Sequence, residues 1–166
     1  IEVYDNVLIE KDFMTCQDIV ANNLWKFSGS ANKSSPFKFW YMNLMDSNFF
    51  TDIFLNYIIK FTNKQFKLIR VYANGQTYGQ DGEFHIDSPD DNAYTFVYYI
   101  SEVNESNIDD IGGYIQIKKD DELICIEPYM NRGILFNSKL QHRGLAPSRL
   151  SGMLRVSIAF KLELLN

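Results

Sequence analysis

Cysteine is scarce in this 166-residue sequence, and the scarcity narrows the protein class. Cys16 and Cys125 lie far apart without metal-ligand spacing, whereas a disulfide framework needs denser cysteine, so we expect two small buried apolar residues in a reducing compartment. No apolar run is long enough to span a bilayer, and no charged-then-apolar leader is visible, although the sequence opens at Ile1. These absences favour a cytoplasmic protein that does not enter a membrane.

Basic charge is also limited. Lys and Arg number 16 against 21 Asp and Glu, giving a net charge of -5 and a pI near 5.0, which argues against a nucleic-acid partner. Aromatic residues make up 15% of the chain, a share that favours strands and aromatic-lined pockets. The length suits one domain with a single core.

The pattern of apolar residues changes along the chain. Helical spacing is visible in "EKDFMTCQDIVANNLWKF" (10–27) and "SNFFTDIFLNYIIKFTN" (47–63), after a weakly alternating "IEVYDNVLI". From about residue 67, seven short β-rich segments are divided by Gly, Asn, Asp and Pro. We therefore predict one α+β domain over residues 1–166, with a helical part at 1–66 packed outside a jelly-roll-like β core at 67–166.

Histidine is as rare as cysteine, and its two positions carry the first functional signal. His85 and Asp87 form an H-x-D tripeptide that, on a strand, projects both side chains to one face. Alone, the tripeptide favours an exposed or hydrogen-bonded histidine beside a turn, because so short a motif is common by chance. His142, the other histidine, completes a 2-His-1-carboxylate set that leaves positions of an octahedral Fe(II) open. Zinc is the chemical rival, but the helical H-E-x-x-H pattern of zinc hydrolases is absent.

A second signal lies in "LRVSIAFKL" near the end of the sequence. Arg155 and Ser157 share one face of the expected strand, and apolar residues take the other. A guanidinium placed against a packed core needs a partner, for which a bidentate carboxylate is the natural choice. That carboxylate belongs either to a ligand or to an acidic residue of the protein. Arg149, in the preceding loop, is expected to be exposed.

Five segments between Leu68 and Leu162 together resemble one family. They are "RVYANGQTYGQDGEFHID", "TFVYYIS", "IGGYIQI", "IEPYMNRGILFNSKLQHRG" and "RVSIAFKL". In this order they resemble the 2-oxoglutarate- and Fe(II)-dependent dioxygenases, especially the prolyl 4-hydroxylase-like branch. The first sixty residues match that family only loosely.

The resemblance implies a fold, a chemistry and a set of site residues. The fold is a double-stranded β-helix (jelly-roll, cupin-like), and the cofactors are Fe(II), 2-oxoglutarate and O2, with ascorbate keeping the iron reduced. No catalytic residue beyond the metal ligands is implied. The implied residues are the iron ligands His85, Asp87 and His142, Arg155 for the distal 2-oxoglutarate carboxylate, and Tyr98, Tyr72 and Ser157 as further cosubstrate contacts.

The activity expected from the resemblance is hydroxylation of an organic substrate, with 2-oxoglutarate and O2 converted to succinate and CO2. The implied substrate is a prolyl residue in a peptide or protein, or a small molecule. Two alternatives stay open: a non-catalytic jelly-roll binding module, and a metal-dependent cupin-like enzyme that does not use 2-oxoglutarate. Loops 74–83, 88–92 and 102–110 are expected at the substrate entrance, and their acidic residues favour a basic or neutral substrate.

Overall fold

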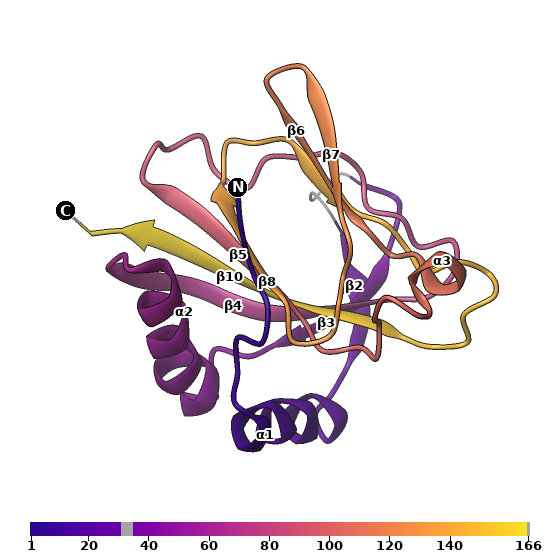
Figure 1. Ribbon diagram of the computed structural model, residues 1–166, viewed down its shortest axis with the longest axis horizontal. Coiled ribbons are helices and arrows are strands. Elements are labelled where there is room, and N and C mark those ends of the chain that lie inside the picture. Colours follow the sequence, from indigo (N-terminus) through magenta and orange to yellow (C-terminus); the bar gives the residue numbers. More distant parts are fainter. Residues whose placement is uncertain (31–34, 166) are drawn as a thin grey trace.

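The computed structural model describes residues 1–30 and 35–165, which form two facing antiparallel sheets with helices outside the larger one (Figure 1). In the described residues the larger sheet has seven strands in the order β1-β8-β5-β10-β4-β3-β2, and the smaller has three in the order β7-β6-β9. The strands are β1 (Glu2–Tyr4), β2 (Lys26–Gly29), β3 (Phe39–Asn43), β4 (Phe66–Gln76), β5 (Ala93–Tyr99), β6 (Ile115–Lys119), β7 (Glu122–Ile126), β8 (Gly133–Asn137), β9 (His142–Gly144) and β10 (Arg155–Leu164).

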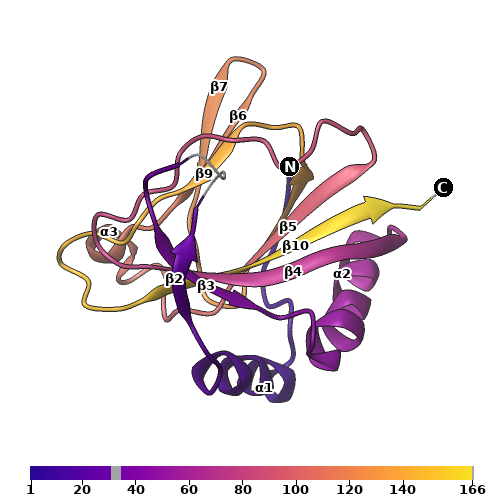
Figure 2. The same ribbon diagram turned by 180° about the vertical axis from the view of Figure 1, so that it is seen from behind.

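Both expected helices are present. The first is α1 (Glu10–Ala21), and the second is a π-helical turn, η1 (Phe49–Phe54), that continues into α2 (Leu55–Thr62). The α2 helix ends at Asn63, which takes the left-handed conformation with φ of 52°. Both helices cover the outer face of the larger sheet, on the side away from the β6–β7 hairpin (Figures 1 and 2). A short third helix, α3 (Ile108–Ile111), follows β5.

The first 66 residues are less helical than their sequence indicates. They also supply β1, which pairs with β8 at one edge of the larger sheet, and β2 and β3, which extend the other edge beyond β4. The helical part and the β core therefore share one sheet. No helix in the described part of the chain is both long and apolar enough to cross a membrane.

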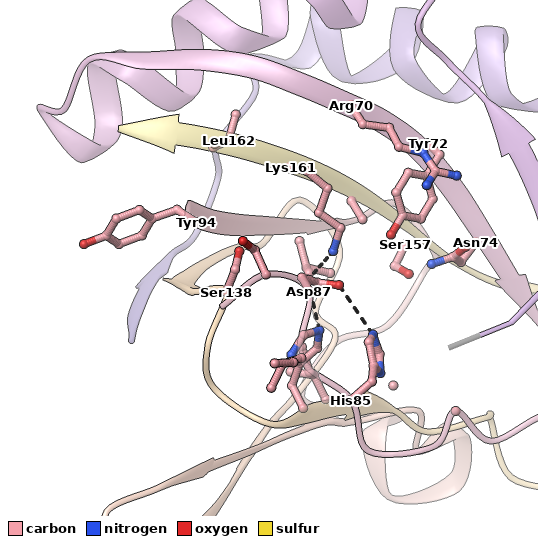
Figure 3. A pocket seen from close by; sticks show the side chains of 18 of the residues that line it. Arg70, Tyr72, Asn74, His85, Asp87, Tyr94, Ser138, Ser157, Lys161 and Leu162 are labelled. Atoms are coloured by element: carbon pink, nitrogen blue, oxygen red, sulfur yellow. Dashed lines mark hydrogen bonds and ion pairs between the residues drawn. The ribbon is translucent and has the colours of Figure 1, made fainter. Parts of the chain in front are cut away.

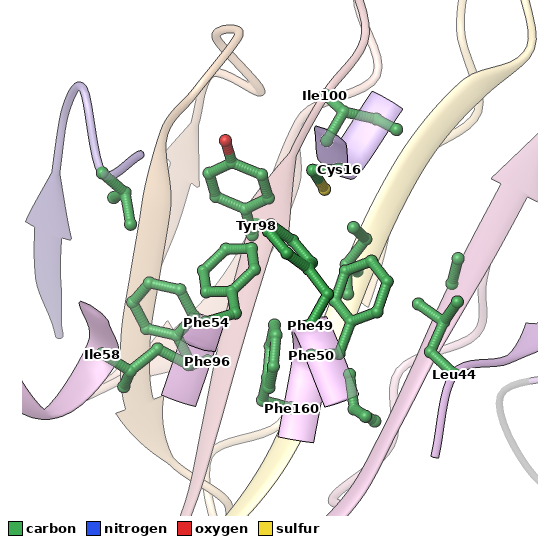
Figure 4. Packing of buried hydrophobic residues seen from close by; sticks show 14 of the residues in the cluster. Cys16, Leu44, Phe49, Phe50, Phe54, Ile58, Phe96, Tyr98, Ile100 and Phe160 are labelled. Atoms are coloured by element: carbon green, nitrogen blue, oxygen red, sulfur yellow. The ribbon is translucent and has the colours of Figure 1, made fainter. Parts of the chain in front are cut away.

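Two apolar clusters occupy opposite faces of the larger sheet. Figure 4 shows the outer one, where Phe96 and Tyr98 of β5 and Phe160 of β10 pack against Phe50 and Phe54 of η1. Since side chains alternate along a strand, the neighbouring β5 residues face the other way and join the inner cluster between the two sheets. The inner cluster consists of Val97, Tyr99, Ile115, Ile117, Ile126, Ile134 and Phe136.

Two expectations from the sequence are wrong in detail. Six of the seven β-rich segments are strands, but "GEFHID" is not, because only His85 makes a β-bridge, to His142. The chain bends at Asp87, and the turn that follows contains Pro89, which has no N–H to continue a ladder. Cys16 is buried as expected, whereas Cys125 is exposed on β7.

Candidate metal centre

His85, Asp87 and His142 converge even though the H-x-D segment is not a strand. The backbones of His85 and His142 exchange hydrogen bonds of 3.1 and 3.0 Å, which brings their rings to a centroid separation of 4.4 Å. Asp87 Oδ1 lies 3.5 Å from His85 Nε2, and its Oδ2 lies 3.3 Å from His142 Nε2. One ligand atom from each residue lies within 4.8 Å of the others, a spacing that fits a single metal ion (Figure 3).

Backbone carbonyls fix the tautomer of both imidazoles. His85 Nδ1 donates to Glu83 O and His142 Nδ1 donates to Leu140 O, each at 2.9 Å. A carbonyl only accepts, so Nδ1 of each ring carries a proton and Nε2 is the nitrogen that faces Asp87. The same outer hydrogen bond orients metal-binding histidines in general. The donor set of this cluster therefore matches a metal ligand set in chemistry as well as in spacing.

The Asp87 carboxylate is held in the charged form. Burial raises the pKa of Asp87, but hydrogen bonds from His142 and His85 and the charge of Lys161 outweigh burial and hold it well below its usual range. Oδ2 accepts a hydrogen bond from Thr95 Oγ1 at 2.6 Å and pairs with the Lys161 ammonium (Figure 3). Oδ1 contacts neither of these groups, so it remains the oxygen available to a metal.

The cluster opens into a cavity of about 1200 Å³ between the two sheets. Most of one wall is the inner face of the larger sheet, where β4 and β10 pair in register from Gln76 opposite Arg155 to Arg70 opposite Lys161. Of the loops expected at the entrance, residues in 74–83 and 88–92 line this cavity, whereas no residue of 102–110 does.

Arg155 is a buried cation in the same cavity, with 2% of its surface exposed. Its Nε donates to Gly113 O at 3.0 Å and its Nη1 donates to Gln76 Oε1 at 2.8 Å, with Ser157 Oγ at 3.4 Å. Gly113 permits this approach: a Cβ there would lie 3.3 Å from the Arg155 side chain, and its φ is +82°. Among the described residues, no Asp or Glu forms an ion pair with Arg155, so of the two partners that the sequence left open, the acidic residue of the protein is not found.

The two tyrosines at the end of β5 face opposite ways. Tyr98 does not line the cavity: it packs in the outer cluster, where its ring lies 4.7 Å from Phe54, and its hydroxyl donates to Asn131 Oδ1 at 2.7 Å. Tyr99 does line the cavity. The Arg155 guanidinium lies 5.0 Å from the Tyr99 ring, and the Tyr99 hydroxyl is buried without a hydrogen-bond partner among the described residues.

The protonation states of Tyr99 and Arg155 leave a hydroxyl donor and a cation side by side, which suits an anionic ligand. Burial raises the pKa of Tyr99, with Arg155 acting against the rise, so the phenol keeps its proton at neutral pH. Burial lowers the pKa of Arg155 from its ordinary value, and the nearby Tyr99 opposes that shift; Arg remains charged in proteins. An unsatisfied buried hydroxyl and an unpaired buried guanidinium are each costly without a ligand.

Two of the remaining predicted residues, and two residues that the sequence did not predict, lie on the cavity wall formed by β4 and β10. Ser157 and Tyr72 line the cavity, as do two cations that were not predicted, Arg70 of β4 and Lys161 of β10. Lys161 had a detectable signal, because it continues the alternation that places Arg155 and Ser157 on one face. Thr95 gave no signal in the sequence, since its role depends on the fold bringing it to Asp87.

Comparison with known proteins gives a fold match but no sequence match. No protein-family model and no curated protein matches the sequence. A prolyl hydroxylase from Trichoplax adhaerens, solved with a hypoxia inducible factor peptide fragment, superposes with a TM-score of 0.71 at 15% identity, covering 98% of this chain and 82% of that one.

Two further solved structures have a similar fold at low sequence identity. A 2OG-Fe(II) oxygenase family oxidoreductase from Burkholderia pseudomallei has a TM-score of 0.73 at 9% identity, covering 96% of this chain and 82% of that chain. HygX from Streptomyces hygroscopicus, with nickel, 2-oxoglutarate and hygromycin B bound, has a TM-score of 0.72 at 11% identity, covering 97% and 81%. The chain therefore has the double-stranded β-helix fold of the 2-oxoglutarate/Fe(II) oxygenases, with an H-x-D…H triad inside it.

Proposed function

We propose that this protein is an Fe(II)- and 2-oxoglutarate-dependent dioxygenase that hydroxylates an organic substrate. The observation that carries the proposal is the presence of two matched features in one cavity. One is the His85–Asp87–His142 cluster, and the other is the buried Arg155, which lacks an acidic partner among the described residues. A metal centre alone does not require a buried unpaired cation, and the dicarboxylate cosubstrate supplies its counter-charge.

In this proposal the protein's residues bind and orient the reacting groups. His85 and His142 present Nε2 to the iron because Glu83 O and Leu140 O hold their Nδ1 protons. Thr95 and Lys161 hold one oxygen of Asp87, so that the other faces the metal. Iron bound there would supply O2 activation coupled to oxidative decarboxylation of 2-oxoglutarate to succinate and CO2, with hydroxylation of a substrate C–H bond.

We assign the distal carboxylate of 2-oxoglutarate to the buried Arg155 and the hydroxyl groups beside it. Arg155 supplies charge, and Ser157 and Tyr99 supply hydroxyl donors beside it. We assign Tyr99 in place of Tyr98, since Tyr98 faces the helices. Tyr72 is a less direct neighbour, because it is already stacked against Arg70 at 4.5 Å.

Residues 1–166 are proposed to act as one catalytic domain, since strands from the first 66 residues complete the sheet that carries the site. The similar structures were solved with a peptide fragment in one case and hygromycin B in another. A prolyl residue in a peptide and a small molecule are thus both candidate substrates.

The test is substrate-independent conversion of 2-oxoglutarate to succinate, measured with Fe(II), O2 and ascorbate as the proposed reductant. Wild-type protein should form succinate, and His85→Ala and Asp87→Ala should abolish it. A non-catalytic module would bind no metal and gain no thermal stability from Fe(II). A metal enzyme that does not use 2-oxoglutarate would bind Fe(II) but show no affinity for 2-oxoglutarate, and either result would refute the proposal.

A further inference from the structure

The cavity has a second cationic end, separate from the Arg155 group. Arg70 and Lys161 are directly paired across β4 and β10, and both side chains line the cavity, Lys161 beside Asp87 and Arg70 beside Tyr72 (Figure 3). Like charges directly opposite each other on neighbouring strands are destabilising. Lys161 is offset by its ion pair with Asp87, whereas Arg70 has no acidic partner among the described residues, so an anion at this end of the cavity would supply the missing counter-charge.

An irregularity of the strand places Arg70 in the cavity. The pairing of β4 with β10 shifts beside Lys161, where Arg70 is opposite Lys161 but Leu68 is opposite Leu162, so Ile69 is the extra residue of a β-bulge. Regular alternation would put Leu68 and Arg70 on the same face. Because of the bulge, Leu68 packs against the outer cluster while Arg70 faces the cavity. Bulges often re-aim side chains next to active sites.

Arg70 is held in place by aromatic groups and not by an acid. Its Nη2 contacts the Tyr41 hydroxyl at 3.2 Å, and its guanidinium stacks 4.5 Å from the Tyr72 ring. Among the described residues, no Asp or Glu forms an ion pair with Arg70. Stacking of this kind fixes the guanidinium plane and leaves its donors free for a planar oxyanion.

The acidic residues around the cavity are engaged elsewhere. Glu163 pairs with Lys67 at 3.4 Å, Asp91 pairs with Lys139, and Asp90 accepts a hydrogen bond from Ser88 Oγ at 3.3 Å. Asp87 carries one negative charge that is shared between Lys161 and the proposed metal. This end of the cavity is therefore electropositive once a divalent ion is bound, despite the net charge of -5 of the whole chain.

We propose that Arg70 and Lys161 form an oxyanion-binding subsite for the substrate, which thus carries a carboxylate or a phosphate group. This inference rests on the proposed function and refines it. Because Lys161 contacts the metal ligand Asp87, the anionic group lies close to the iron, within a few bonds of the carbon that is hydroxylated. The subsite replaces the expectation of a basic or neutral substrate, which relied on the acidic residues of the entrance loops.

Calorimetric titration of the Fe(II)- and 2-oxoglutarate-loaded protein without oxygen tests the subsite. The probes are N-acetylglycine, its neutral amide N-acetylglycinamide, and inorganic phosphate. The anions should bind at least about tenfold more tightly than the amide, as expected for a charge-assisted hydrogen bond. Tighter binding of N-acetylglycine supports a carboxylate substrate, and tighter binding of phosphate supports a phosphorylated one.

Substitutions at the two cations test whether they bind the anionic probes. Arg70→Gln should weaken anion binding by about tenfold or more without touching Asp87. Lys161→Gln should also weaken it, and it is measured at saturating Fe(II) because Lys161 holds the metal ligand Asp87. The control Lys11→Gln changes an exposed lysine of α1 outside the cavity and should leave anion affinity unchanged. Equal binding of acid and amide, or no effect of Arg70→Gln, would overturn the subsite. So would a larger loss of 2-oxoglutarate affinity in Arg70→Gln than in Arg155→Gln, because the cationic end would then hold the cosubstrate.

The two proposals fail separately. Succinate formation by the wild-type protein without anion preference would leave the dioxygenase assignment intact and refute only the oxyanion subsite. Anion binding without any 2-oxoglutarate turnover would refute the dioxygenase assignment and, with it, the substrate role of this subsite.

Discussion

Replacing Arg155 with Met should remove 2-oxoglutarate binding while leaving the fold intact. Met keeps the length and apolar volume of the side chain and removes the charge. In the native cavity, Nε and Nη1 of Arg155 are used by Gly113 O and Gln76 Oε1. Among the described residues Nη2 donates to no protein acceptor, so this nitrogen is free for a ligand carboxylate.

The magnitude follows from the contacts that a carboxylate would lose. Hydrogen bonds to charged groups contribute about 1.5–3 kcal/mol each. Loss of two such bonds costs at least about 3 kcal/mol, a decrease in 2-oxoglutarate affinity of about 100-fold or more. In the absence of ligand, removing a buried unpaired cation offsets the loss of its bonds to Gly113 and Gln76, so the free energy of unfolding should change by less than about 1 kcal/mol.

Both effects are measured on Fe(II)-loaded protein under anaerobic conditions. At a 2-oxoglutarate concentration of about 100 times the wild-type Kd, ligand binding stabilises wild-type protein by about 2.7 kcal/mol. At the same concentration, a 100-fold weaker variant gains only about 0.4 kcal/mol. The control is Arg149→Met, since Arg149 is exposed and outside the cavity. If Arg155→Met binds 2-oxoglutarate as tightly as the control, the assignment of Arg155 is refuted.

Three other predictions concern metal binding, packing and pH dependence. Thr95→Val removes the 2.6 Å hydrogen bond to Asp87 and should weaken Fe(II) binding by about 10- to 100-fold in a chelator competition; unchanged affinity would contradict the orienting role. Gly133→Ala places a Cβ 2.1 Å from the buried Phe96 ring and should cost about 1–3 kcal/mol or more of unfolding free energy. Gly152→Ala has no atom within 4 Å and should be close to neutral in the same urea titration, so equal losses would argue against this packing. Because the folded-state pKa of Asp87 lies below its unfolded value of about 3.9, its charged form stabilises the protein above about pH 4, and this stability is lost as the pH falls further. The destabilisation of metal-free protein by Asp87→Asn should therefore shrink between pH 6 and pH 3, and a constant difference would contradict the sign of this pKa shift.

Strand alternation accounts for what the sequence could predict about the site. On β10 the period of two separates Arg155 and Ser157 from Val156 and Ile158, and the structure has the same division of faces. Extending the alternation past Ala159 to Lys161 would have found a second cation of β10 in the cavity. The helices were predictable for a similar reason, because their apolar spacing is that of an amphipathic helix.

Long-range pairing accounts for what the sequence could not predict. The position of Tyr99 inside the cavity depends on which face of β5 meets the helices, and both faces of that strand are apolar. The convergence of His85 with His142 comes from one isolated bridge between distant segments. The cationic pair of Arg70 and Lys161 depends on a bulge in β4. No local pattern encodes these features.

Anomalous diffraction from crystals grown with Fe(II) and 2-oxoglutarate without oxygen tests the central claim most directly. Data collected at the iron absorption edge locate the metal independently of the protein model. We predict one iron ligated by His85 Nε2, Asp87 and His142 Nε2, and a 2-oxoglutarate whose distal carboxylate contacts Arg155. An iron peak elsewhere, or a loaded crystal with Arg155 free of the cosubstrate, would contradict this account.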